Sequence, residues 1–199
     1  MSNLFNLKYQ LVQYGVHHNN RVNILIHLVC VPVILWTAMV FLANTGPLVD
    51  PAAHAGPIFA WILRAFGPDG ALALTLFYVN YYFLLAPDAA ILYIPILFFM
   101  SLTATQFNHY NANANQIAAS LHIVSWILQF IGHGLTEKRN PKLMDNLVQA
   151  VVLAPFFVFY EILFAFGFHP ELKAEVQQAV DADIKAFKTA RAIPIIKVN

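Results

Sequence analysis

Charged side chains are scarce in this 199-residue chain: they make up 11% of it, while 59% of the residues are hydrophobic. A typical soluble domain carries about 25% charged residues. The composition therefore favours a polytopic membrane protein over a soluble domain. The net charge is only +1, so the chain lacks the basic face that nucleic-acid binding requires.

Cysteine and several catalytic motifs are also missing. Cys30 is the only cysteine, which excludes an internal disulfide. The sequence contains no HExxH, CxxC or GxSxG motif, no phosphate-binding glycine loop and no set of histidine boxes like that of membrane desaturases. No cleavable signal peptide is expected, because residues 1–20 are mostly polar and the first apolar run begins only at Ile24.

The apolar residues are grouped into five runs, at 24–43, 71–85, 89–105, 117–131 and 147–166. The first is long enough to cross a bilayer core, and the others are similar or slightly short. The runs predict an all-α, polytopic membrane helical bundle of about four to five membrane helices, formed by residues 24–166. Apolar residues recur every three or four positions in 3–16 and in 171–192. They predict amphipathic helices in the flanking segments 1–23 and 167–199 of a single domain, 1–199. Residues 44–57 are expected to form a loop with a solvated His54.

Basic residues near helix ends predict the orientation. They flank the first and fourth runs, at Lys8, Arg21, Lys138, Arg139 and Lys142. The positive-inside rule places both groups in the cytosol. The histidine-containing segments 17–27 and 129–145 then share the cytosolic face. Five complete spans would leave the basic C-terminal tail on the wrong side, so either the run containing Pro155 re-enters or one short run does not span.

Histidines are the most informative polar residues. Five of the eight lie in or beside apolar runs: His18, His27, His109, His122 and His133. Neutral imidazole is a common ligand of iron, zinc and copper. The sequence favours functional roles for His27 and His133, whereas His122 is interpreted as a helix-packing residue and His17 as a solvated neighbour of His18. His109 stays open between a structural and a ligand role.

Polar residues one helical turn from these histidines are candidates for supporting roles. Asn23 precedes His27 by four residues and is placed to orient it. Glu137 follows His133 by four residues, either as a ligand or as a hydrogen-bond partner that holds the imidazole. Glu161 lies inside the fifth run and requires a partner, which is either the site or a basic residue.

Three motifs carry a resemblance to a known family. They are His18-x4-Asn23-x3-His27 with Val31-Pro32, Gln129-Phe130-x-Gly132-His133-x3-Glu137-x3-Pro141, and Asp145-Asn146-Leu147-Val148-Gln149 with Ala154-Pro155 and Glu161. From about Tyr14 to Leu172 the chain resembles the Mpo-type 2-hydroxy fatty acid dioxygenases. The resemblance implies a multi-pass enzyme of the endoplasmic reticulum membrane, with its active site towards the cytosol. Such an enzyme uses Fe(II) and O2 to convert a 2-hydroxy long-chain fatty acid to the acid one carbon shorter, in fatty acid α-oxidation and phytosphingosine degradation.

The resemblance also implies site residues. The metal-ligand candidates are His18, His27, His109 and His133, with Glu137 and Asn23 beside them. The expected topology, however, places His109 on the opposite membrane face. The acyl chain of the substrate is expected to lie between the helices, among membrane lipids. Two other classes stay open: a membrane haem protein for electron transfer, with two axial histidines, and a non-catalytic membrane scaffold whose histidines pair with carboxylates.

Overall fold

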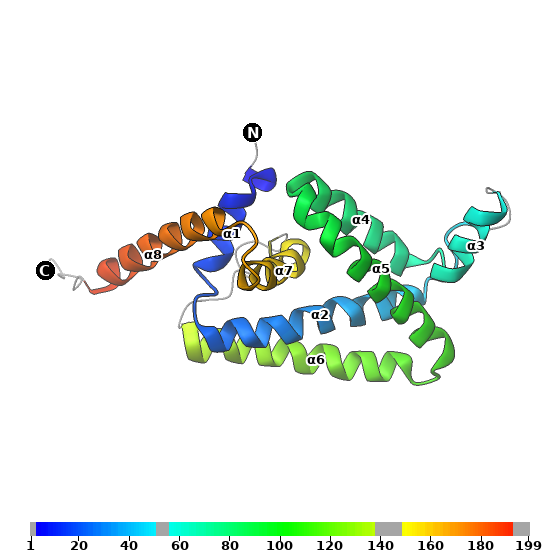
Figure 1. The fold of residues 1–199 in the computed structure, drawn as a ribbon. Coiled ribbons are helices and arrows are strands. Elements are labelled where there is room, and N and C mark those ends of the chain that lie inside the picture. Colours follow the sequence, from blue (N-terminus) through cyan, green and yellow to red (C-terminus); the bar gives the residue numbers. More distant parts are fainter. Residues whose placement is uncertain (1–2, 51–55, 138–148, 193–199) are drawn as a thin grey trace, which may run out of the picture. The chain divides into compact units, whose positions relative to one another are not determined.

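The structure is a computed structural model and describes residues 3–50, 56–137 and 149–192. Every regular element in these ranges is helical, which confirms the predicted all-α class (Figure 1). The elements are η1 (Asn3–Phe5), α1 (Leu7–Gly15), α2 (Arg21–Ala43), α3 (Pro57–Phe66), α4 (Gly70–Leu85), α5 (Pro87–Tyr110), α6 (Ala114–Gly132), η2 (His133–Glu137), η4 (Gln149–Leu153), α7 (Ala154–Ala165) and α8 (Pro170–Ala192). They form two compact units, one of Met1–Ile24 with His133–Asn199 and one of Leu25–Gly132. The prediction of a single domain stays a prediction.

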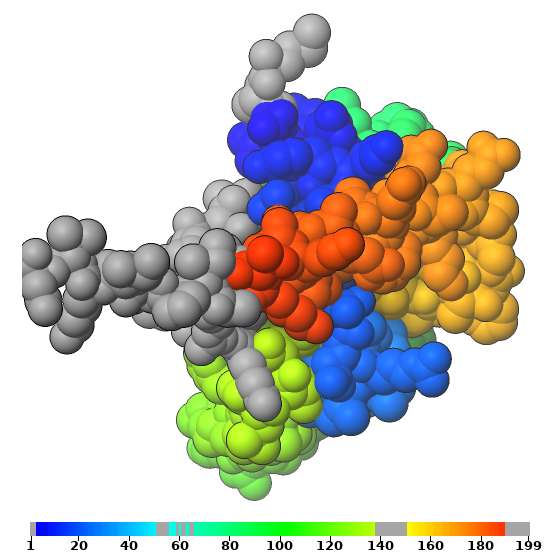
Figure 2. Space-filling model, turned by 90° about the vertical axis from the view of Figure 1, so that its left-hand side faces the viewer, coloured from blue at the N-terminus to red at the C-terminus, as the bar shows by residue number. Residues whose placement is uncertain are grey.

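The first unit is built on the contact between α1 and α8. The two helices lie side by side in Figure 1, and Figure 2 shows the dark blue N-terminal segment directly above the orange and red α8. A Cβ atom at Gly15 would lie 2.7 Å from Cγ2 of Val180, so the absence of a side chain permits the close approach. Lys8 Nζ lies 2.7 Å from Glu175 Oε2 at the exposed edge of the contact. The helices predicted at the two ends of the chain are present, and they pack against each other.

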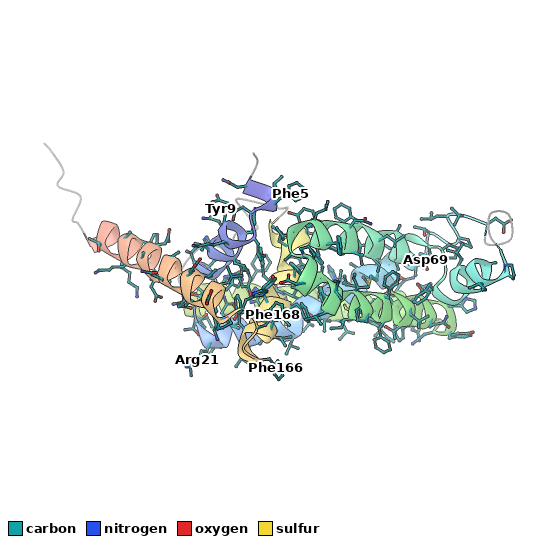
Figure 3. The ribbon with its side chains drawn as sticks, turned by 45° about the horizontal axis from the view of Figure 1, so that its top comes forward. Phe5, Tyr9, Arg21, Asp69, Phe166 and Phe168 are labelled. Carbon is teal, nitrogen blue, oxygen red and sulfur yellow. The ribbon has the colours of Figure 1, made fainter. Side chains whose placement is uncertain are left out.

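The second unit contains an antiparallel hairpin of α4 and α5, joined at Ala86. Asp69 begins α4, because its carboxylate accepts hydrogen bonds from the backbone N–H groups of Ala71 and Leu72 (Figure 3). The ring of Tyr82 stacks on the ring of Tyr78 at 5.4 Å, between centroids, and on that of Tyr93 at 5.9 Å. All three tyrosines are buried, so the aromatic side chains fill the hairpin interior.

Helices α2 and α6 of the second unit run alongside each other (Figure 1). Polar contacts join them at two levels. Asn44 Nδ2 donates to Asn115 Oδ1 at 2.9 Å near the end of α2, and Thr37 contacts His122 further along. Polar pairs of this kind hold helices together where the surroundings are apolar.

Three described helices are long and apolar enough to cross a membrane: Arg21–Ala43, Pro87–Tyr110 and Ala114–Glu137. A fourth span is counted if the pair Val151–Ala165 and Pro170–Thr189, bent by 117°, is taken as one. Helix α4 is apolar but has only 16 residues. The structure thus gives three to four candidate spans where the sequence predicted about four to five. The charge pattern predicted that either the run containing Pro155 re-enters or one short run does not span, and both alternatives stay predictions.

Several sequence predictions lie outside the described residues. These are the solvated His54, the basic residues Lys138, Arg139 and Lys142, and the motif residues Pro141, Asp145, Asn146, Leu147 and Val148. The cytosolic orientation depends on that basic group, so it stays a prediction.

Candidate metal centre

Two of the predicted ligands meet in the first unit. His18 lies in the loop after α1, and His133 is the first residue of the π-helical turn η2. Their rings touch edge to face with centroids 4.7 Å apart, and a ligand nitrogen of one lies within 4.8 Å of a ligand nitrogen of the other. The side chains are 9% and 5% exposed. Buried imidazoles in contact with each other are a suitable start for a metal site.

Backbone contacts determine which nitrogen of His18 faces a ligand. Nδ1 lies 2.9 Å from the carbonyl oxygen of Tyr14. A carbonyl only accepts hydrogen bonds, so Nδ1 carries a proton, and in the neutral ring Nε2 then holds the lone pair. The Tyr14 ring stacks on the imidazole, with centroids 3.9 Å apart and planes 11° apart. Both contacts hold His18 in the orientation and tautomer of a metal-binding histidine.

Glu137 connects the two histidine-bearing segments. Its Oε1 accepts hydrogen bonds from the backbone N–H groups of Asn19 at 2.9 Å and Asn20 at 2.8 Å, and from Nδ2 of Asn23 at 3.2 Å. Asn19 and Asn20 directly follow His18, and Glu137 closes the turn that His133 opens. The carboxylate therefore ties the His18 loop and the start of α2 to η2. The sequence predicted that Glu137 is a metal ligand or a hydrogen-bond partner of His133. It did not predict that the carboxylate joins these two segments.

Asn23 is fully buried and takes part in the same cluster. Besides its bond to Glu137, Nδ2 lies 3.3 Å from the carbonyl oxygen of His17. His17 itself is half-buried rather than fully solvated. Asn23 thus supports the loop that carries His18. The sequence predicted a different role for Asn23, the orientation of His27 one turn along α2.

His27 follows Asn23 by one turn of α2 and is 3% exposed. The boundary between the two units falls between Ile24 and Leu25, inside this continuous helix. Residues four apart in a helix lie on one face. His27 therefore occupies the same face of α2 as Asn23, whose amide is bound by Glu137.

His109 lies elsewhere in the second unit. It is exposed in the last turn of α5 and lines an open cavity of about 320 Å³ together with Asp69, Thr105 and Ala43. Ala43 ends α2 and follows His27 by roughly 24 Å along the helix axis. The structure therefore does not bring His109 to His27, and the membrane face on which His109 lies stays a prediction.

His122 has both ring nitrogens engaged within the second unit. Trp126 Nε1 donates to its Nε2 at 3.0 Å, so the proton is on Nδ1, which donates to Thr37 Oγ1 at 2.7 Å. The Thr37 hydroxyl in turn lies 2.9 Å from the carbonyl oxygen of Val33. Both imidazole nitrogens are used in helix packing, which is the role interpreted from the sequence.

Tyr14 is a residue that sequence reasoning missed. Burial raises the pKa of its phenol well above the usual range, and the carboxylates of Glu161 and Glu137 raise it further. The phenol therefore stays neutral at working pH. Tyr14 precedes His18 by four residues, as Asn23 precedes His27. This repeated spacing could have indicated from the sequence that Tyr14 contacts His18.

Comparison with known proteins gives an independent result. The model of the family described as 2-hydroxy-palmitic acid dioxygenase Mpo1-like matches residues 4–166. The 2-hydroxy-palmitic acid dioxygenase MPO1 of Saccharomyces cerevisiae is 35% identical over 182 residues, which cover 92% of each chain. No solved structure matches the chain. Because the family model covers most of the sequence, this protein belongs to the Mpo1-like family.

Proposed function

We propose that this protein is a 2-hydroxy fatty acid dioxygenase of the endoplasmic reticulum membrane, with Fe(II) bound by His18, His27 and His133. The observation that carries the proposal is the buried pair of His18 and His133, with Nδ1 of His18 bonded to a carbonyl so that the neutral ring would bind a metal through Nε2. Family membership and the activity in the name of the yeast relative support the same chemistry.

The residues fit a metal of this kind. Neutral imidazoles suit Fe(II), and iron oxygenases often combine histidines with open coordination positions. Nitrogens bound to one ion lie about 3–4 Å apart, given metal–nitrogen distances near 2.1 Å. The ligand atoms of His18 and His133 lie within 4.8 Å, so a small movement of the rings suffices. His27 is proposed as the third ligand, since it shares a helix face with Asn23. Bound Fe(II) would supply the activation of O2.

The reaction balances with O2 as the sole oxidant. A 2-hydroxy acid and O2 give the acid one carbon shorter, CO2 and water. Carbon 2 is oxidised from an alcohol to an acid and carbon 1 from a carboxyl group to CO2, and together they supply the four electrons that O2 accepts. The protein then needs to bind the head group, keep its histidines oriented and exclude water.

The membrane supplies the affinity for the rest of the substrate. Burial of a long acyl chain contributes about 0.8 kcal/mol per CH2 group. The apolar helices α2, α5 and α6 are candidates for spanning the bilayer in which such a chain dissolves. We propose that the chain enters among membrane lipids while its head group reaches the histidines from the cytosolic side.

The haem alternative does not gain support from the geometry. Two axial histidines lie on opposite faces of the macrocycle. The rings of His18 and His133 touch edge to face at 4.7 Å between centroids, which leaves no room for a porphyrin between them. A non-catalytic scaffold predicts no bound metal and is separated from our proposal by metal analysis.

Anaerobic reconstitution tests the proposal. The purified full-length protein in detergent is loaded with Fe(II), then given O2 and 2-hydroxypalmitate, and the product is measured by mass spectrometry. We expect the C15 acid in amounts that match the O2 consumed. Retention of iron without turnover, or turnover without metal, would contradict the assignment.

Substitutions of single histidines test which of them bind the iron. We expect His18→Ala, His27→Ala and His133→Ala each to lose bound iron and turnover. His169→Asn is the matched control, because His169 is an exposed histidine with a φ of 46°, which asparagine tolerates. Full activity of the His133→Ala variant would end the proposal.

A further inference from the structure

The side chain of Tyr14 presents a buried hydroxyl that its surroundings do not satisfy. The residue is 6% exposed, its hydroxyl oxygen is shielded from solvent, and no hydrogen-bond partner for that oxygen exists among the described residues. The ring contacts two others, the His18 imidazole at 3.9 Å and the Phe157 ring at 5.0 Å between centroids. The ring contacts fix the hydroxyl in position, and within the part of the chain that the structure describes it has no partner.

A group of this kind requires an explanation. Nearly all buried polar side-chain atoms in proteins have a partner, and an unsatisfied one destabilises the fold. A phenylalanine would make the same ring contacts with His18 and Phe157 without this penalty. The tyrosine hydroxyl thus has no role in packing, which indicates a partner that arrives with a ligand.

The chemistry of the position restricts that ligand. A phenol is protonated at neutral pH and carries one O–H donor, for which the described surroundings of Tyr14 offer no acceptor. Its ring is stacked on His18, next to the edge contact with His133. A ligand that reaches the hydroxyl therefore lies beside the candidate metal centre and offers an acceptor oxygen.

We propose that the Tyr14 hydroxyl donates a hydrogen bond to the carboxylate of the 2-hydroxy acid and makes the enzyme selective for acids. This inference rests on the proposed function, which supplies an anionic head group at the histidines. This hydrogen bond orients the substrate carboxylate. It also offsets the free-energy cost of burying the Tyr14 hydroxyl. Tyr14 is then a substrate-binding residue, and its ring additionally positions His18.

The test is Tyr14→Phe in the full-length, Fe(II)-loaded protein. This change removes one oxygen and keeps the ring contacts. We expect KM for 2-hydroxypalmitate, and its Kd under anaerobic conditions, to rise roughly tenfold to hundredfold, the range for a hydrogen bond to a charged group. Iron content should equal that of the wild type, and the melting temperature of the ligand-free protein should not fall. Tyr9→Phe is the matched control, since Tyr9 is on the same helix and 41% exposed (Figure 3).

A neutral analogue identifies the group that receives the bond. Hexadecane-1,2-diol keeps the chain and the 2-hydroxyl but lacks the carboxylate. We expect it to inhibit the wild type and Tyr14→Phe equally. An equal loss of affinity for acid and diol would assign the bond to the 2-hydroxyl and overturn the selectivity for acids.

Other outcomes separate the inference from the function on which it rests. Unchanged Kd and KM in Tyr14→Phe, with normal turnover of the wild type, would refute the role of Tyr14 alone. Loss of iron in Tyr14→Phe would make the hydroxyl part of the metal site and refute it as well. A wild type that neither binds nor converts 2-hydroxy acids would refute both proposals.

Discussion

Oε1 of Glu137 lies 2.8 Å from the backbone N–H of Asn20 and binds the start of α2 to the turn that contains His133. Glu137→Ala removes the acceptor of this and two further hydrogen bonds. We expect the free energy of unfolding to fall by about 1–3 kcal/mol and metal affinity to fall about 10–100-fold, as for other residues that position ligands. Thermal unfolding in detergent and metal titration measure the two effects.

Glu137→Gln distinguishes hydrogen bonding from charge. The amide oxygen still accepts hydrogen bonds from backbone N–H groups, so this variant should lie between the wild type and Glu137→Ala. Glu175→Gln is a control for an exposed carboxylate, whose ion pair with Lys8 contributes about 0–1 kcal/mol. Equal metal affinity in Glu137→Ala and the wild type would contradict the positioning role.

The hydrogen bonds of His122 predict coupling between α2 and α6. His122→Phe leaves the Trp126 N–H and the Thr37 hydroxyl without this partner, while Thr37→Val removes the other side of the contact. In a double-mutant cycle we expect a coupling free energy of about 0.6 kcal/mol, typical of polar pairs between membrane helices. Iron content should not change. Additive effects of the two substitutions would show that the pair does not hold the helices together.

The close contact of α1 with α8 predicts a size-dependent defect. In Gly15→Ala the new Cβ would lie 2.7 Å from Val180 Cγ2, and valine is restricted at χ1. We expect destabilisation of about 1–3 kcal/mol, measured by thermal unfolding. Val180→Ala in the same chain should recover part of this loss, because it removes the clashing methyl groups. A double variant no more stable than the sum of the single effects would contradict the proposed contact.

His109 provides a test of the ligand set. It lies in the last turn of α5 and lines a cavity with Ala43, at the opposite end of α2 from His27. We expect His109→Ala to retain iron and turnover, whereas His27→Ala loses both. Metal analysis of the two variants, purified in parallel, decides the question. Loss of iron from His109→Ala would restore the residue to the ligand set that the family resemblance implied.

Metal removal should weaken the fold as well as stop turnover. A ligand that binds only the folded state at 100 times its Kd stabilises that state by about 2.7 kcal/mol. Chelation under anaerobic conditions should therefore lower the melting temperature, and Fe(II) should restore it. The same treatment should leave the melting temperature of the His133→Ala variant unchanged, which separates specific binding from a general effect of the chelator.

Some site residues could be found from the sequence because their relationships are local. Asn23 and His27, and likewise His133 and Glu137, are one helical turn apart, so spacing predicts their shared faces. The Glu137 contacts with Asn19 and Asn20 join positions more than a hundred residues apart, for which spacing carries no information. The stack of Tyr14 on His18 depends on how the loop after α1 turns, which spacing does not predict.

The sequence by itself determined the helical membrane class, because long apolar runs with little charge can satisfy their backbone groups only as helices in an apolar surrounding. It also nominated His18, His27, His109 and His133 as candidate metal ligands, which stays a prediction. Only the tertiary structure decided that His18 and His133 touch, that Glu137 binds backbone groups and that both nitrogens of His122 are used in packing. The physical reason is that periodicity places side chains on a helix face, whereas tertiary packing determines which faces meet.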